Sequence, residues 1–184
     1  MASDGPSKKD KPPAVLFGTL PAELKPSATE KRQLAAFSKS LSARIADGRR
    51  FTCLIADDGE LLRLNSTFLG NEYPTDVLSF PSPDSSAIAP SELGEIAISI
   101  ERAAAQADEF GHAAFDELRI LMLHGLLHLT GLDHEKDNGE MARAEQRWRA
   151  EFQLPQTLIA RQRDMKDDAP RRKRHKHTVR TAAL

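Results

Sequence analysis

The sequence predicts a single compact α+β domain in which one small mixed sheet packs with helices. Three observations predict this class. Short apolar runs of strand length are interspersed with longer segments of helical periodicity. The chain has 184 residues, which suggests one domain, and 40% of them are hydrophobic, which is enough for a core. No internal repeat is evident.

The elements are expected in a fixed order. The first helix has Leu34, Phe37 and Leu41 at helical spacing, and Gly48 follows it. Asp58 is the expected N-cap of the second helix. A loop rich in serine and proline is expected over 83–91. Strands are expected over 51–56, 77–80 and 95–100, and helices over 27–46, 60–68, 101–109, 115–130 and 138–152, with the helix over 115–130 buried.

The two ends of the chain differ from its middle. Residues 1–13 are expected to form a disordered leader, 14–158 a single domain and 159–184 a basic disordered tail. From Arg161 onward there are nine lysines and arginines and three acidic residues, so the tail carries +6 and the remainder −7 of the net charge of −1. Such a tail can contact RNA phosphates by counterion release, or serve only for solubility.

Membrane and secretory features are not apparent. The longest apolar stretch, 118–132, contains Arg119 and two histidines and is too short to span a bilayer. The apolar piece over 14–20 is followed by Pro21 and lacks the pattern of a secretory signal. The single cysteine, Cys53, cannot form an internal disulfide, which fits a reducing compartment. We therefore expect a cytoplasmic protein without a membrane partner.

Three histidines lie within one short stretch, at His124, His128 and His134. The first two are four residues apart, so a helix places them on one face, one turn apart. Gly131 can end that helix and return the chain so that the third imidazole reaches the same point. Three imidazoles with an open fourth position are typical of a catalytic zinc. The sequence therefore predicts one zinc ion per chain at the end of a buried central helix, in a metal-hydrolase-like domain.

The alternative is that these histidines are core residues bonded to the backbone. Burying several imidazoles is unfavourable unless each has a partner, and one shared metal would satisfy all of them. The pattern of zinc peptidases places a glutamate directly after the first histidine, as general base. That position is Gly125 here, and a glycine cannot accept a proton. The spacing indicates a zinc hydrolase, and Gly125 argues against an ordinary metallopeptidase.

Further motifs occur in a fixed order between 51 and 152. Besides the histidine run, they are Leu64-Asn65, then Tyr73-Pro74-Thr75-Asp76-Val77-Leu78-Ser79-Phe80-Pro81, then Leu93-Gly94-Glu95-Ile96, and finally Met141 and Glu145. Together they resemble the YbeY family of bacterial metal-dependent endoribonucleases, in which aspartate is more usual than Glu95. The resemblance implies a zinc-dependent, single-strand-specific endoribonuclease that matures small-subunit ribosomal RNA and takes part in ribosome assembly or quality control.

The resemblance also implies partners, namely ribosomal RNA, small-subunit ribosomal proteins and a ribosome-associated GTPase. Two alternatives remain open. One is a non-catalytic, zinc-containing ribosome-assembly factor, and the other is a zinc hydrolase of another substrate, which Gly125 disfavours if that substrate is a peptide. The general base and the attacking nucleophile are not indicated by the residues.

One position departs from the family pattern. Leu69 stands where the family usually has an arginine that is proposed to act on the RNA phosphate. Leucine has neither a charge nor a hydrogen-bond donor, so it cannot stabilise a phosphorane. Another basic residue can take its place, activity can be reduced, or the arginine can be dispensable. Arg63 is the candidate substitute for binding substrate.

Four other polar residues are candidates for the site, and each has a structural alternative. Asp76 can accept a hydrogen bond from the N–H of a zinc-binding imidazole, as carboxylates do at zinc sites, or can cap a turn after Pro74. Asp133 can contact the metal's water or the third histidine, or can stabilise its own turn. Glu95 is a candidate catalytic group or an exposed strand-end charge. Asn65 can bind the substrate backbone or cap its helix.

Overall fold

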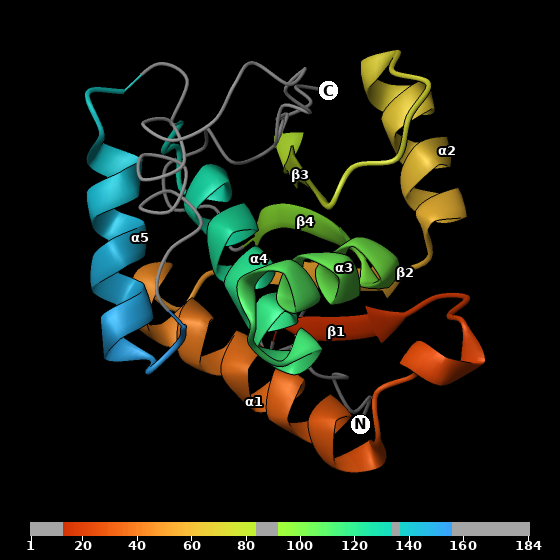
Figure 1. Ribbon diagram of the computed structural model, residues 1–184. Helices are drawn as coiled ribbons and strands as arrows, with labels where there is room; N and C mark the ends of the chain where they lie inside the picture. Colours follow the sequence, from red (N-terminus) through yellow and green to blue (C-terminus); the bar gives the residue numbers. More distant parts are fainter. Residues whose placement is uncertain (1–12, 84–91, 134–136, 156–184) are drawn as a thin grey trace, which may run out of the picture.

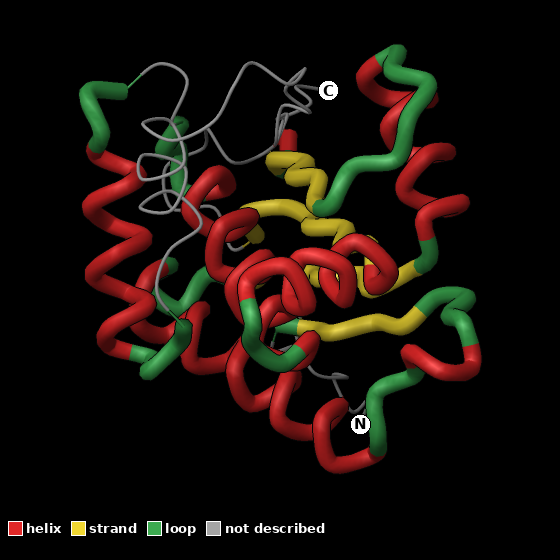
Figure 2. Tube along the Cα trace, viewed as in Figure 1, coloured by secondary structure: helices red, strands yellow, loops and turns green. Residues whose placement is uncertain are grey.

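The computed structural model describes residues 13–83, 92–133 and 137–155. Figure 1 shows α4 in the centre of the molecule, and Figure 2 shows the strands as one group with helices around them. This arrangement confirms the predicted α+β class with a single domain. The elements are β1 (Ala14–Phe17), the short 3-10 helix η2 (Ala22–Leu24), α1 (Ala28–Ile45), β2 (Arg50–Ala56), α2 (Asp58–Leu69), β3 (Val77–Pro81), β4 (Glu92–Ser99), α3 (Ile100–Phe110), α4 (Ala114–Leu129) and α5 (Glu140–Glu151).

The sheet has the strand order β1-β2-β4-β3. Strands β1, β2 and β4 are parallel, whereas β3 runs antiparallel to β4 with Val77 opposite Ile98. The expected mixed sheet is therefore confirmed. The sequence did not predict β1, because this edge strand has only four residues between Pro13 and Gly18. Its pairing to β2 is a tertiary contact that no local pattern reveals.

The helix ends follow the capping rules, with one correction. Ser27 forms a capping box with Glu30 at the start of α1, since each side chain bonds the other residue's backbone N–H. At α2 the N-cap is Asp57, whose carboxylate accepts from the N–H of Glu60 at 2.9 Å. The expectation that Asp58 caps this helix was wrong by one residue. Adjacent aspartates are equivalent in propensity, and only the backbone conformation distinguishes them.

Helix α4 is buried along most of its length, as predicted, because it contacts the sheet as well as α1, α3 and α5. The main core lies on this side of the sheet and includes Trp148 and Phe152 of the α5 region at its margin. A smaller apolar cluster lies on the opposite face, under α2. Its buried members are Ala56, Leu61, Leu78 and Ala97.

Several predicted segments cannot be compared with the structure. Residues 1–12 of the expected leader, most of the loop over 83–91 and the whole basic tail lie outside the described residues. Within the described part of the chain, no helix has both the length and the apolar character needed to cross a membrane.

Candidate functional site

His124 and His128 lie one turn apart in the C-terminal half of α4. Their ring centroids are 4.9 Å apart, with an angle of 72° between the ring planes. His128 is buried, whereas 15% of the His124 side chain remains exposed. The structure thus brings the two imidazoles side by side at the end of the central helix, as their spacing predicts.

The third histidine, His134, lies outside the described residues, so the three-histidine ligand set stays a prediction. The turn that leads toward it is described. The N–H of Gly131 donates to the carbonyl of His128 at 2.9 Å, and that of Leu132 donates to Leu127 at 3.2 Å. This pair of bonds ends the helix and reverses the chain directly after the two histidines. Asp133 follows half-buried, and its carbonyl oxygen accepts from the N–H of Asp137.

A carboxylate from α5 contacts the first histidine. Glu145 Oε2 lies 3.0 Å from Nδ1 of His124, and its other oxygen accepts from the guanidinium of Arg149. Both residues of this ion pair are almost fully buried. Burial raises the pKa of Glu145, but His124 and Arg149 together outweigh it and lower that pKa to about 2. The carboxylate is therefore ionised at neutral pH.

A second buried acid–histidine pair lies at the other end of α4. Nε2 of His112 contacts Oε2 of Glu117, whose side chain is fully buried. Burial raises the pKa of Glu117, although His112 and Arg149 act in the opposite direction. His112 lies in the turn between α3 and α4, and its buried partner is five residues along the chain.

Gly125, between the two histidines, packs tightly against the sheet. A Cβ atom at this position would lie 2.8 Å from Cγ2 of Ile96 and 3.2 Å from Oγ of Ser79. The Ser79 hydroxyl also donates to the carbonyl of Gly125 at 3.1 Å. A glutamate here would require α4 to move away from β3 and β4. The glutamate that serves as base in zinc peptidases is absent here, and the packing of Gly125 against β3 and β4 leaves no space for its side chain.

Asp76 is buried at the start of β3, where it joins two elements. Its carboxylate accepts from the Thr75 hydroxyl at 3.0 Å, the N–H of Val77 at 2.9 Å and the amide of Gln106 in α3 at 2.9 Å. These are the contacts expected of the turn-capping alternative. The predicted hydrogen bond between Asp76 and a zinc-binding imidazole stays a prediction.

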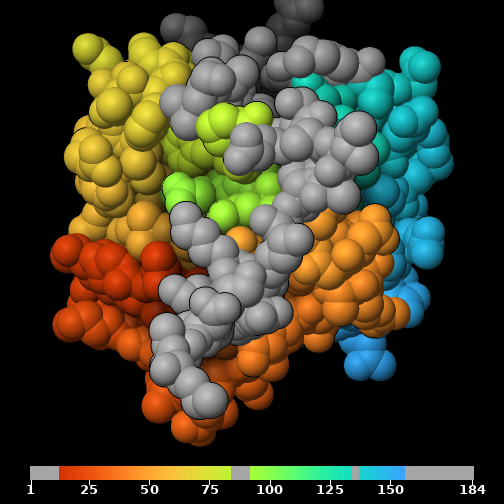
Figure 3. Space-filling view, turned by 180° about the vertical axis from the view of Figure 1, so that it is seen from behind, coloured from red at the N-terminus to blue at the C-terminus, as the bar shows by residue number. Residues whose placement is uncertain are grey.

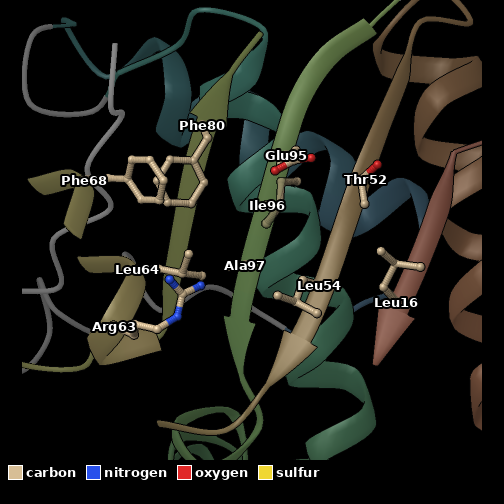
Figure 4. Close-up of a pocket in the computed structure, with 10 residues that line it drawn as sticks. All are labelled: Leu16, Thr52, Leu54, Arg63, Leu64, Phe68, Phe80, Glu95, Ile96 and Ala97. Atoms are coloured by element: carbon tan, nitrogen blue, oxygen red, sulfur yellow. The ribbon is translucent and has the colours of Figure 1, made fainter. Parts of the chain in front are cut away.

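Glu95 and Arg63 lie together in a groove on the face of the sheet opposite α4. Figure 3 shows this side of the molecule, with β3 and β4 in green beside α2 in yellow, and Figure 4 shows the residues that line the groove. Arg63 donates to Glu60 through two hydrogen bonds, at 2.8 and 2.7 Å. The groove has a volume of about 300 Å³, and its lining contains neither His124 nor His128. Its lining residues are Leu16, Thr52, Leu54, Arg63, Leu64, Phe68, Phe80, Glu95, Ile96 and Ala97.

Asn65 holds the loop between α2 and β3. Its side-chain amide donates to the carbonyl of Tyr73 at 2.7 Å, and its side-chain oxygen accepts from Asn71 at 3.1 Å. These bonds fix the loop and do not cap the helix, and the role of Asn65 in binding substrate stays a prediction. Leu69, at the end of the same helix, packs against the small apolar cluster under α2. An arginine there would have to direct its charge away from apolar neighbours.

Sequence reasoning gave no site role to Glu145, Arg149 or Glu117. The i,i+4 spacing of Glu145 and Arg149 on one helix was a signal for their ion pair. The contact of Glu145 with His124 was not predictable in this way, because it joins residues 21 positions apart. The pair of His112 and Glu117 spans the start of α4 and has no characteristic spacing.

The fold and the described site define an α+β domain with a His-x-x-x-His pair on its buried central helix and a close-packed glycine between the two histidines. A family model described as Endoribonuclease YbeY matches residues 23–153. This chain therefore belongs to the YbeY endoribonuclease family, as its motifs predict.

Several curated relatives extend the match over most of the chain. An Endoribonuclease YbeY of Solibacter usitatus (strain Ellin6076) is 49% identical over 148 residues, which is 80% of this chain and 93% of that protein. Another, of Koribacter versatilis (strain Ellin345), is 44% identical over 152 residues, or 78% and 97% of the two chains. The solution structure of TM1509 from Thermotoga maritima aligns with 88% of this chain and 99% of that chain, at 25% identity and a TM-score of 0.48.

Proposed function

We propose that this protein is a zinc-dependent endoribonuclease that cleaves single-stranded ribosomal RNA. The observation that carries the proposal is the side-by-side placement of His124 and His128 on α4, in a chain that belongs to an endoribonuclease family. Imidazole is a preferred zinc ligand, and two imidazoles one helical turn apart can bind one ion.

The residues present fit a zinc ion. Glu145 accepts a hydrogen bond from Nδ1 of His124, and in that tautomer Nε2 is the ring nitrogen that carries the lone pair a metal requires. His124, His128 and His134 would be the three ligands. A zinc ion bound there would supply a Lewis acid for a phosphoryl oxygen and would lower the pKa of a bound water or of an attacking hydroxyl. The described residues would orient His124 and His128 at the end of α4.

The cellular setting is also a proposal. It comprises a cytoplasmic location, a role in maturing small-subunit ribosomal RNA, and contacts with small-subunit ribosomal proteins and a ribosome-associated GTPase. The similarity to relatives named endoribonucleases supports the type of substrate. The basic tail adds nine cationic side chains after residue 160, and these can contribute sequence-independent phosphate contacts.

The test is a zinc titration of cleavage. Metal-free protein is mixed with a single-stranded ribosomal RNA fragment, and zinc is added in steps from zero to several equivalents. We expect cleavage to appear with zinc and to reach a plateau near one equivalent, while a duplex of the same sequence stays intact. Absence of cleavage at every zinc level, from protein that has bound the metal, would contradict the proposal.

A second candidate function is supported by one observation. Leu69, at the position where the family usually has arginine, is the last residue of α2 and packs against the small apolar cluster. A chain without that cation can still bind zinc and act as a non-catalytic ribosome-assembly factor. The same titration separates the two functions, because this candidate predicts full zinc binding and no cleavage.

A further inference from the structure

Glu145 and Arg149 form a buried ion pair in the interface between α4 and α5. The exposed fractions of their side chains are 1% and 3%. Arg149 bonds one carboxylate oxygen of Glu145 and also donates to the carbonyl of Pro155 at 3.3 Å, so the segment that follows α5 anchors it. The remaining carboxylate oxygen points to Nδ1 of His124.

A buried ion pair of this kind needs an explanation other than stability. Removing two charges from water is unfavourable, and well-packed apolar residues of similar volume often give an equally stable protein. The pair instead gives the carboxylate one fixed position and keeps it charged. Arg149 holds one carboxylate oxygen and the ring of His124 contacts the other, so both oxygens of the buried carboxylate have a partner. The acceptor facing His124 is therefore held in one position beside the guanidinium.

We propose that Glu145 is a positioning residue that fixes His124 in the tautomer with its hydrogen on Nδ1, so that Nε2 carries the lone pair. Arg149 holds the carboxylate in place for this purpose. The inference rests on the proposed zinc site for its function, since a fixed Nε2 lone pair is what a metal-binding imidazole requires. A carboxylate behind the ring also makes the imidazole a stronger ligand.

The chain contains a matched control for this contact. Glu117 is likewise a buried glutamate in contact with a histidine, His112. Glu117 lies in α4, the helix that also carries His124. His112 is not part of the predicted ligand set. Replacing Glu117 thus tests the general effect of losing a buried acid–histidine contact, without touching His124.

The experiment uses the full chain with ¹⁵N-labelled histidine, in the metal-free form at about pH 8. Two-bond nitrogen–hydrogen correlation spectra report which ring nitrogen of each histidine carries the hydrogen. Because Glu145→Gln alone leaves the charge of Arg149 buried and unpaired, the main variant combines Glu145→Leu with Arg149→Met, which keeps the interface filled and neutral. The control is Glu117→Gln. Zinc affinity is then measured for all proteins by competition with a chromophoric chelator.

We expect His124 to have its hydrogen on Nδ1 in the native protein and to show a mixture of tautomers in the double variant. We also expect the double variant to bind zinc about 10- to 100-fold more weakly, and Glu117→Gln to bind it as the native protein does. An unchanged His124 tautomer in a folded double variant would overturn the inference. A native protein with the fixed tautomer but no zinc binding would support the inference and contradict the proposed function.

Discussion

Gly125 of the central helix packs directly against the side chain of Ile96 in β4. A Cβ on Gly125 would lie 2.8 Å from Cγ2 of Ile96, a distance that real Cβ contacts do not show. This contact sets the position of α4, and hence of the histidines on either side of Gly125, relative to β4. It also excludes a glutamate from the place where zinc peptidases carry their base.

Gly125→Ala is expected to destabilise the protein. Alanine is favoured over glycine in a helix by about 1 kcal/mol, but overpacking a core costs roughly 1–3 kcal/mol. We expect the free energy of unfolding in urea to fall by about 1 kcal/mol. The control is Gly59→Ala in α2, where a Cβ would meet its nearest atom at an ordinary 3.4 Å. Equal stability of the two variants would contradict this account of the contact.

Gly94→Ala is expected to separate β3 from β4. Gly94 has φ +140°, and a Cβ there would lie 2.1 Å from the carbonyl oxygen of Phe80. Strain and clash together should lower the free energy of unfolding by about 2 kcal/mol or more. Gly48→Ala is the matched control, since its φ is +77° but a Cβ would have open space. Hydrogen exchange of the β3 amides would reveal the lost pairing, and equal losses in both variants would argue against the clash.

Leu69→Arg is expected to raise RNA cleavage, because it places a cation at the position where the family resemblance implies a phosphate contact. The introduced guanidinium has to point away from the apolar cluster that Leu69 packs against, and the lost packing should lower the free energy of unfolding by about 1 kcal/mol. The control is Leu62→Arg, which adds the same charge to the same helix at an exposed position. If cleavage by the two variants is equal, the phosphate role does not belong to residue 69.

Cys53 is expected to react with thiol reagents only when the protein unfolds. The thiol is fully buried, and burial raises its pKa from 9.0 to about 12. The folded state holds this proton more tightly, so the thiol's contribution to stability is present below pH 9 and decreases as pH rises from 9 toward 12. Labelling at pH 8 should therefore rise in parallel with the unfolded fraction in urea. Rapid labelling without denaturant would show that β2 is not packed as described.

The sequence predicted those features that local spacing determines. Helix α4 and the shared face of His124 and His128 follow from the apolar periodicity and the four-residue separation. What it did not predict depends on tertiary contacts. Strand β1 needs β2 as a partner, Glu145 meets His124 only when α5 packs on α4, and Glu95 and Arg63 share a groove only because α2 covers one sheet face. The ligand role of His134 stays a prediction.

The most direct test combines metal content and cleavage in one preparation of His128→Ala. We expect native protein to contain one zinc per chain by elemental analysis and to cleave single-stranded ribosomal RNA. His128→Ala should lose most of the metal and most of the cleavage while keeping its helical circular dichroism. A folded His128→Ala protein with unchanged zinc content and unchanged cleavage would contradict the assignment of the α4 histidines as the metal site.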